Sequence, residues 1–349
     1  MKLNQWQMTV WIVLVVTLTL LGSAVYALRP TPNKKITVAF YNVENLFDTL
    51  DDAQNEGDNE YLPDGRNNWT PERYLKKLNN LSKVITGIVG GKSAPTLIGL
   101  AEVENDKVLD DLIKRTTIDN EYSFVHYDSP DERGIDVALL YDSRLFSVKS
   151  SEPLAVRFDF EPNDRTRDVL YVNGMLGKQE VHVFVNHWPS RREGMAKSSP
   201  KREAAAQVVR QKVDAILADN PNAKIIIMGD FNDSPTDKSV KQILQAQTTY
   251  SPVDAQKLYN LSFNLTRKGL GSHRYDGEWS MLDQIIVSGA LLSKKGLRTT
   301  PNNVHVFKQD WMLYDDKRNG GKSPSTTYGG NKYYGGYSDH LPTFVELMY

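Results

Sequence analysis

The sequence contains no cysteine among its 349 residues. This absence excludes disulfide bonds, thiolate-ligated zinc, iron–sulfur clusters, a thiol nucleophile and a lipidated N-terminal cysteine. It does not assign a redox compartment, because a protein without thiols persists in either. The sequence also lacks an excess of either charge, with 42 Lys and Arg against 43 Asp and Glu. Any contact with a polyanion must therefore come from a local patch. With 40% hydrophobic and 24% charged residues, the composition is that of a globular protein.

Only one long hydrophobic run is present, and it lies near the N-terminus at residues 10–21. Lys2 precedes it, and Val25-Tyr26-Ala27 follows it with the small-x-small pattern of a signal-peptidase site. We therefore expect a signal peptide over residues 1–27 and an exported protein, periplasmic or secreted. The alternative is a membrane anchor, because residues 8–28 are long enough to span a bilayer.

The rest of the chain, residues 28–349, shows the pattern of a single α/β domain without repeats or linkers. Thr70 and Pro71 predict the start of a helix that runs to about residue 89. Ser199 and Pro200 predict the start of a second helix, which ends before Asn220, and a shorter helix is expected over 236–245. Segments rich in β-branched and aromatic residues predict strands at 36–43, 96–103, 122–128, 136–142, 169–176, 181–188, 224–231, 282–288 and 341–347.

Two loops exceed the usual length, 48–68 and 317–337. The first is strongly acidic and the second is rich in Gly, Ser and Tyr. The acidic loop would repel a polyanion if it faced the site. A structural Ca²⁺ in this loop is an alternative, although the spacing is not that of an EF-hand.

Polar residues gather where the predicted strands end or begin. Taken singly, each is typical of a turn, but the whole set offers hard oxygen ligands together with two histidines. Glu102 and Asp339 are ligands that Mg²⁺ accepts, and His187 and His340 would serve as acid and base near neutral pH. The histidine spacing does not fit a helical zinc motif. The other strand-end residues of this kind are Asn42, Glu44, Asn186, Asp230, Asn232, Asp233 and Asp283.

Seven segments, in this order, resemble the motifs of the endonuclease/exonuclease/phosphatase superfamily, which includes deoxyribonuclease I. The resemblance covers residues 36–347 and is nearest to exported bacterial members. It implies an α/β fold, a four-layer sandwich of two mixed β-sheets face to face with helices on the outer faces. The segments are FYNVENLFD (40–48), LIGLAEVEN (97–105), GIDVALLYD (134–142), NHWPSR (186–191), IIMGDFND (226–233), SMLDQIIVS (280–288) and YSDHLP (337–342).

The resemblance also implies roles for individual residues. Ala101 stands where the family usually has Gln, which puts one orienting hydrogen bond in doubt, and Glu44 has no counterpart, so an orienting role and a turn role stay open. The implied catalytic residues are His187, Asp230, Asn232, Asp283 and His340. The implied metal-binding residues are Asn42, Glu102 and Asp339. The implied substrate-binding residues are Arg133, Arg167, Ser190 and Arg191.

The implied reaction is Mg²⁺-dependent phosphoester hydrolysis, with Mn²⁺ as an alternative ion. Asp283 would hold His340, and either His340 or Asp230 would activate the attacking water. We expect a nuclease, because the stretch 191–202 is rich in Arg and Lys. A phosphatase or phosphodiesterase for lipid head groups or small phosphorylated molecules is the alternative, and a binding module on an inactive scaffold is a third. A monomer without an obligate protein partner is expected.

Overall fold

The computed structural model describes residues 35–53, 55–91, 93–116 and 121–349. The expected signal peptide or anchor, residues 1–27, lies outside the described residues. In the described part of the chain, no helix combines the length and the apolar character needed to cross a membrane. Residues Ile36–Met348 form one compact unit, and the fold below refers to this unit.

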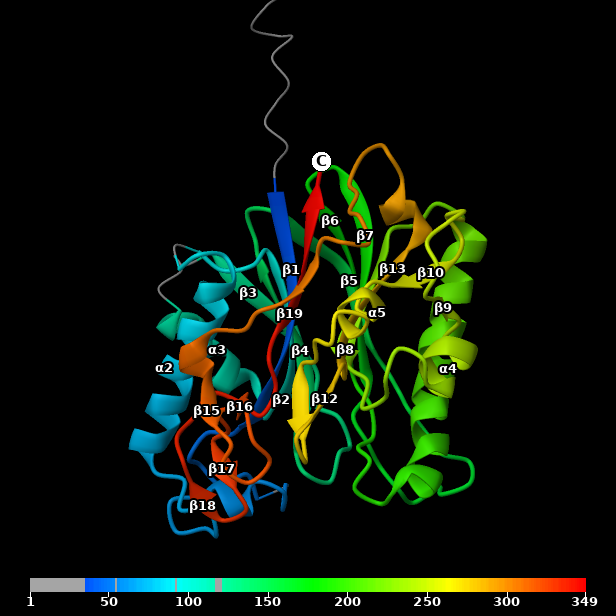
Figure 1. Cartoon of the computed structure of the whole chain (residues 1–349). Helices are drawn as coiled ribbons and strands as arrows, with labels where there is room; N and C mark the ends of the chain where they lie inside the picture. Colours follow the sequence, from blue (N-terminus) through cyan, green and yellow to red (C-terminus); the bar gives the residue numbers. More distant parts are fainter. Residues whose placement is uncertain (1–34, 54, 92, 117–120) are drawn as a thin grey trace, which may run out of the picture. The chain divides into compact units, whose positions relative to one another are not determined.

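Two mixed β-sheets form the centre of the fold (Figure 1). The first sheet contains β1 (Lys35–Leu46), β2 (Leu97–Val103), β3 (Tyr122–His126), β4 (Asp136–Asp142), β14 (Val304–Val306) and β19 (Thr343–Met348). Its order is β14-β19-β1-β2-β4-β3, and β1 and β2 are parallel. The last strand of the chain therefore lies beside the first.

The second sheet has seven strands in the order β5-β6-β7-β8-β13-β10-β9. They are β5 (Phe146–Leu154), β6 (Val169–Leu176), β7 (Gln179–His187), β8 (Ile225–Asp230), β9 (Ala246–Gln247), β10 (Leu258–Asn260) and β13 (Asp283–Ser288). Every residue of β8 is buried, which explains its continuous apolar run. The sheets pack face to face: a Cβ on Gly99 of β2 would lie 3.1 Å from the side chain of Met228 on β8.

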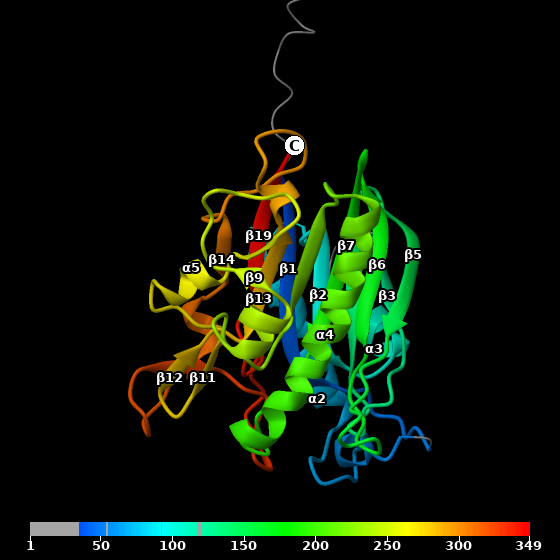
Figure 2. The same cartoon turned by 90° about the vertical axis from the view of Figure 1, so that its right-hand side faces the viewer.

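Helices cover the outer faces of both sheets (Figures 1 and 2). Helices α2 (Pro71–Ile88) and α3 (Asp106–Arg115) pack their apolar sides on the first sheet, and α4 (Met195–Asp219) packs on the second. The four-layer sandwich is confirmed. Thr70 caps α2 as predicted, because its side chain accepts a hydrogen bond from the Arg73 N–H. The remaining helical turns are η1 (Asn59–Tyr61), η2 (Ser239–Ile243), α5 (Phe263–Thr266), η3 (Gly289–Leu292) and η4 (Asp310–Met312).

Two helix predictions are wrong in their bounds. Helix α4 begins at Met195, after Gly194 with φ of 85°, so Pro200 lies inside the helix and Ser199 is not its cap. The additional N-terminal turn of α4, before Pro200, is stabilised by Glu193, which pairs with both Lys197 and Lys201. The helix expected over 236–245 is reduced to the short turn η2.

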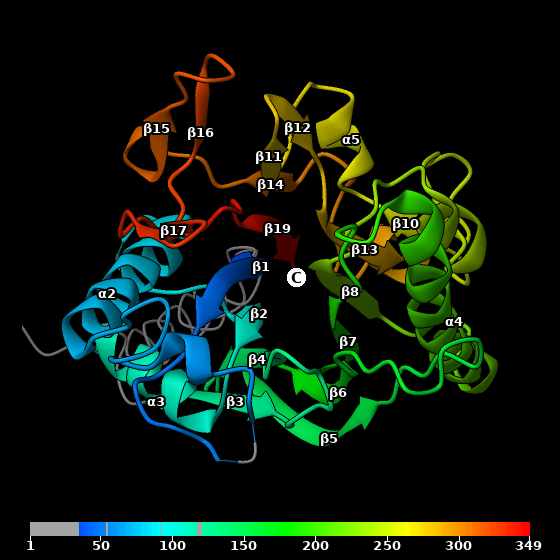
Figure 3. The same cartoon turned by 90° about the horizontal axis from the view of Figure 1, so that it is seen from below.

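Three small hairpins lie at the end of the molecule where β1, β2, β7 and β8 finish, which is the end viewed in Figure 3. Two of them, β15–β16 and β17–β18, account for much of the long loop expected over 317–337. The hairpin strands are β11 (His273–Tyr275) with β12 (Glu278–Ser280), β15 (Leu313–Asp315) with β16 (Lys322–Pro324), and β17 (Tyr328–Gly329) with β18 (Lys332–Tyr333).

Candidate active site

The register of the second sheet brings three of the predicted residues together. Asp230, the last residue of β8, has His187 of β7 as its Cα partner on one side. On its other side it has Asp283, the first residue of β13. His340 precedes β19 and reaches the same point from the first sheet, where its ring meets Asp283. The site therefore lies between the two sheets, at the ends of their central strands.

The predicted pairing of Asp283 with His340 is confirmed. The Asp283 Oδ2 and His340 Nδ1 atoms are 2.7 Å apart, and both side chains are buried. This contact leaves Nε2 of His340 facing Asp230 Oδ2 at 3.7 Å and Asp339 Oδ1 at 4.0 Å. Burial opposes protonation of the ring, but Asp283, Asp339 and Asp230 outweigh it and hold the His340 pKa well above its usual value.

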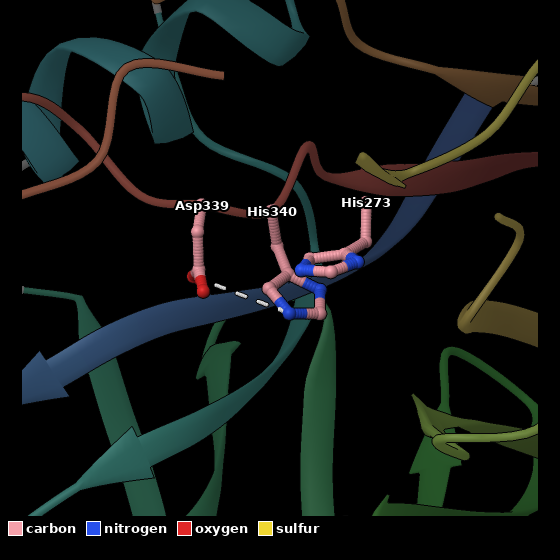
Figure 4. Close-up of side chains that lie close together, drawn as sticks. All are labelled: His273, Asp339 and His340. Atoms are coloured by element: carbon pink, nitrogen blue, oxygen red, sulfur yellow. Dashed lines mark ion pairs between the residues drawn. The ribbon is translucent and has the colours of Figure 1, made fainter. Parts of the chain in front are cut away.

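Figure 4 shows Asp339 and His340 together with a third residue, His273. The rings of His273 and His340 have centroids 4.7 Å apart, and the two residues form an isolated β-bridge. Burial and the neighbouring His340 lower the His273 pKa to about 4, so this ring is neutral at pH 7. His273 lies outside the sequence motifs, because only the hairpin β11–β12 carries it to the site.

Asp230 is held by two donors. Asn42 Nδ2 donates to its Oδ2 at 3.1 Å, and the Asn232 N–H donates to its Oδ1 at 2.9 Å. Burial raises the Asp230 pKa to about 6. The Oδ1 atom of Asn42 already accepts the Glu44 N–H. Both polar atoms of Asn42 are thus engaged by the protein, and its Nδ2 orients Asp230.

His187 faces the site through Nε2, which lies 3.8 Å from both Glu102 Oε1 and Asp230 Oδ2. Its Nδ1 is buried without a hydrogen-bond partner among the described residues. Burial, together with the nearby Arg167 guanidinium, lowers the His187 pKa well below its usual value. The ring is therefore neutral near pH 7, with its Nε2 facing the two carboxylates.

Glu102 is the carboxylate best placed to hold a cation. Its Oε2 accepts the Asn45 N–H at 3.0 Å and lies 3.3 Å from Arg133 Nη2, whereas its Oε1 has no hydrogen-bond partner within the described residues. Burial opposes ionisation, but Arg133 and the two site histidines hold the Glu102 pKa well below its usual range. The half-exposed Asp339 offers a second carboxylate beside His340. These hard oxygen donors fit Mg²⁺.

The backbone bends sharply where these side chains leave their strands. The pairing of β1 with β2 is irregular between Asn42 and Leu46, and that of β2 with β4 between Ala101 and Val103. Left-handed residues other than glycine cost about 1 kcal/mol or more each and concentrate at functional sites. Four of them border this site: Glu44, Asn45, Glu102 and Asn232, with φ of 55°, 53°, 65° and 48°.

A buried ion pair, which the sequence did not predict, supports the segment that carries Asp339 and His340. Glu44 Oε2 accepts the Thr327 N–H at 2.7 Å, and Lys77 Nζ lies 3.7 Å from the same carboxylate oxygen. Lys77 Nζ also donates to Thr327 Oγ1 at 2.6 Å and to the Tyr337 carbonyl at 2.9 Å. Glu44 therefore has an orienting role in addition to its place in the bend. The sequence signal that could have indicated this ion pair is Lys77, a lysine at a position of α2 that is otherwise occupied by core residues.

The predicted substrate-binding residues occupy different surroundings. Arg133 contacts Glu102, and Ser190 lines a cleft beside it. Arg167 is buried and donates to Asp131 and to the His187 and Trp188 carbonyls.

Arg191 donates to the Asn232 carbonyl and pairs with Asp233 and Asp237. In this arrangement Arg167 and Arg191 support the strand ends that carry His187 and Asn232.

The acidic loop 48–68 is not a compact ligand cage. In the part of the chain that the structure describes, the groups of three clustered carboxylate and imidazole side chains lie elsewhere. Two of these groups belong to the site, and both include His340. The third comprises His126, Asp128 and Asp136.

Comparison with known proteins gives a family and a fold. A model of the "Endonuclease/Exonuclease/phosphatase family" matches residues 37–349, whereas no curated protein sequence matches. Among solved structures, a Bacteroides thetaiotaomicron endonuclease/exonuclease/phosphatase family protein is similar, with 15% identity, TM-score 0.53, and coverage of 91% of this chain and 99% of that one.

Two further structures are similar at the same level. One is the human Nocturnin catalytic domain with bound sulfate anion, with 15% identity, TM-score 0.53, and coverage of 91% and 98%. The other is D. rerio TDP2 complexed with single strand DNA product, with 14% identity, TM-score 0.51, and coverage of 90% and 99%. At these identities the likeness concerns the fold.

Proposed function

Because this chain belongs to the endonuclease/exonuclease/phosphatase family, we propose that it is a Mg²⁺-dependent phosphodiesterase that cleaves nucleic acid. The observation that carries the proposal is the convergence of Asp230, His187 and the Asp283–His340 pair opposite Glu102. Such a set of acid, base and metal-binding groups has no evident structural purpose. A protein of the same fold, D. rerio TDP2, holds a single strand DNA product, which supports nucleic acid as the substrate.

Glu102 and Asp339 would hold the ion, which supplies positive charge to the phosphoryl group and to the leaving oxygen. Asp230 is the better general base of the two candidates. Its carboxylate is oriented by Asn42 and Asn232, and its pKa of about 6 leaves it ionised yet basic near neutral pH.

The two histidines would bind the phosphoryl oxygens. His340 is held by Asp283 and keeps its proton, so its Nε2 donates a charge-assisted hydrogen bond. His187 is neutral and donates from Nε2 on the opposite side of Asp230. This division of roles leaves proton abstraction to Asp230 and charge stabilisation to the imidazoles.

The test is hydrolysis by the purified protein, with and without EDTA and added Mg²⁺. The substrates are single-stranded and duplex DNA, RNA, bis-p-nitrophenyl phosphate, sphingomyelin and inositol phosphates. We expect EDTA to abolish cleavage and Asp230→Asn to remove it, while Asp219→Asn, an exposed carboxylate at the end of α4, leaves it unchanged. Full activity in excess chelator would rule out the metal-dependent mechanism. Turnover of the small or lipid phosphoesters without oligonucleotide cleavage would replace the nuclease proposal with the phosphatase alternative.

We also propose that the protein is exported, on the basis of the hydrophobic run at residues 10–21 and the small-x-small site that ends at Ala27. Fractionation of a bacterial host with N-terminal sequencing of the product tests this. Export with a new N-terminus near residue 28 supports a cleaved signal peptide. Export with Met1 intact supports an anchor, and a soluble cytoplasmic product with Met1 intact contradicts export.

A further inference from the structure

A cleft of about 370 Å³ opens directly beside the metal-binding carboxylate. Arg133 forms part of its wall and at the same time contacts Glu102, so the cleft borders the site. Ser190 lines it too, three residues after the catalytic His187. Arg165 and Arg192 complete its basic side. A substrate seated on Glu102 therefore has this cleft as its neighbour on the far side of Arg133.

The charges in the cleft separate into paired and unpaired groups. Lys201 is buried against Glu161, Asp164 and Glu193, so it offers nothing to a ligand. Arg165 and Arg192 are exposed, and neither has an ion-pair or hydrogen-bond partner among the described residues. The stretch 191–202 was expected to bind a phosphate backbone, and Arg192 is the residue of this stretch that remains available to a ligand in the cleft. Arg165, which lies outside the stretch, is a second available guanidinium group. Free guanidinium groups are suited to phosphate oxygens.

An exposed aromatic ring packs on a residue of the cleft wall. Phe158 lines the cleft, and Phe160 packs on it with ring centroids 5.8 Å apart. The Phe160 side chain is 52% exposed, which leaves a large apolar ring in contact with water. Free arginines beside an exposed aromatic ring are typical of surfaces that bind single-stranded nucleic acid by phosphate contact and base stacking.

The other side of the Asp131–Glu132 segment has the opposite character. There a cleft of about 910 Å³ opens, and no Lys or Arg from the described ranges lines it. A polyanion would meet an excess of carboxyl groups in this direction, although Asp131 is paired with Arg167. Its carboxylates belong to Asp52, Glu56, Glu104, Asp128, Asp131, Glu132 and Asp136.

We propose that the strand flanking the scissile phosphate runs through the cleft of Arg165 and Arg192, as single-stranded nucleic acid. A neighbouring phosphate binds the two guanidinium groups, and a base stacks on Phe160. The acidic cleft prevents the strand from extending in the opposite direction. This inference rests on the proposed function for the reaction but concerns the residues that select the substrate.

The first experiment measures binding of a fluorescein-labelled oligothymidylate by anisotropy in EDTA, where no turnover interferes. Arg165→Gln with Arg192→Gln is compared with Lys294→Gln and Lys295→Gln, exposed lysines beyond the opposite end of β8. We expect the arginine variant to raise Kd about tenfold or more. Its log Kd–log salt slope should fall by about 0.7, the value for one phosphate contact on a single strand. The lysine variant should change neither quantity.

Two further variants test the direction and the stacking. Glu56→Gln with Asp128→Asn in the acidic cleft should tighten binding, because repulsion is relieved. Phe160→Ala should weaken binding, and Phe160→Tyr should restore it. Equal binding by the arginine variant and the wild type, or equal losses in the lysine control, would overturn the inference, as would a wild type that does not bind the oligonucleotide.

Hydrolysis of bis-p-nitrophenyl phosphate with Mg²⁺ separates this inference from the proposed function. The small ester does not reach the cleft, so the arginine variant should hydrolyse it at the wild-type rate. A parallel loss of this activity would show that the arginines serve the reaction itself, against the inference. Arginine-dependent oligonucleotide binding without hydrolysis of any phosphoester would instead overturn the proposed function alone.

Discussion

Asp283→Asn is the most informative single change in the site. His340 has one hydrogen bond that fixes its ring, the 2.7 Å contact with Asp283, because Asp230 and Asp339 lie at 3.7 Å and 4.0 Å from the other nitrogen. Asp283 Oδ1 has no partner among the described residues. An asparagine must therefore either bury an unpaired NH₂ group there or turn it toward Nδ1 of His340.

Each of these two orientations of the asparagine side chain has a cost in free energy. A buried unpaired NH₂ destabilises the oriented state by about 1–3 kcal/mol. An NH₂ turned toward Nδ1 holds the proton on Nε2 and removes the positive charge from the ring. Loss of one positioned donor that stabilises developing charge lowers kcat by about 10²–10³-fold, or about 2.7–4 kcal/mol. We expect Asp283→Asn to fall in this range, with little change in KM.

The pH dependence of kcat shows whether the loss of activity comes from the protonation state of His340. In the wild type the carboxylates hold the His340 pKa well above its usual value, so the protonated ring persists into alkaline solution. Removing the Asp283 charge lowers that pKa, and the alkaline decline in kcat must then begin at a lower pH. Rates on bis-p-nitrophenyl phosphate across pH measure this, with Asp219→Asn as the exposed control and thermal unfolding as the check on folding.

A double variant tests whether Asp283 acts through His340. Asp283 acts through His340, so Asp283→Asn with His340→Ala should cost little more than His340→Ala alone. Additive losses, or an alkaline limb that stays in place in Asp283→Asn, would refute the proposed coupling.

Three further outcomes are expected. Glu102→Gln should raise the Mg²⁺ concentration for half-maximal rate about tenfold or more, because a neutral amide is a poorer ligand for a hard cation; an unchanged Mg²⁺ titration contradicts this role. Lys77→Met leaves Glu44 buried without its counter-charge and should cost about 3–5 kcal/mol in urea unfolding; a loss within error of Lys77→Arg argues against the ion pair. Burial, with Asp48 and nearby carboxylates, raises the Glu104 pKa to about 8, so folded-state stability should fall as pH rises from about 4.5 to 8; Glu104→Gln should lack this slope in urea melts, and an identical slope contradicts it.

The strands and the polar residues at their ends were predictable from the sequence because both signals are local. The run 224–231 is apolar until Asp230, and the structure buries all of β8 on both faces. The contact between Asp283 and His340 was not predictable from local signals. Local patterns place each residue at a strand boundary, and only the family resemblance places the two boundaries together.

The partners of the basic residues were not predictable from the sequence. The stretch 191–202 has the pattern of an exposed basic surface, yet Lys201 is buried against carboxylates from the loop before β6. Its charge is visible in the sequence, whereas its burial depends on a chain segment nearly forty residues away. The same holds for Glu44 and Lys77, which approach each other only after β1 and α2 have packed. Long-range charge pairing is decided by tertiary structure, and composition says nothing of it.

The place of β19 between β14 and β1 has a consequence for biosynthesis. Ser338 donates to the Asn42 carbonyl at 2.8 Å, so the final strand and the first are joined at the site. A ribosome that has translated the first three hundred residues has made Glu102, His187 and Asp230 but not His340. The nascent polypeptide then also exposes the edge of β1 that β19 will cover. The pocket is therefore completed only when the last strand has been made, because that strand brings His340 and covers the edge of β1.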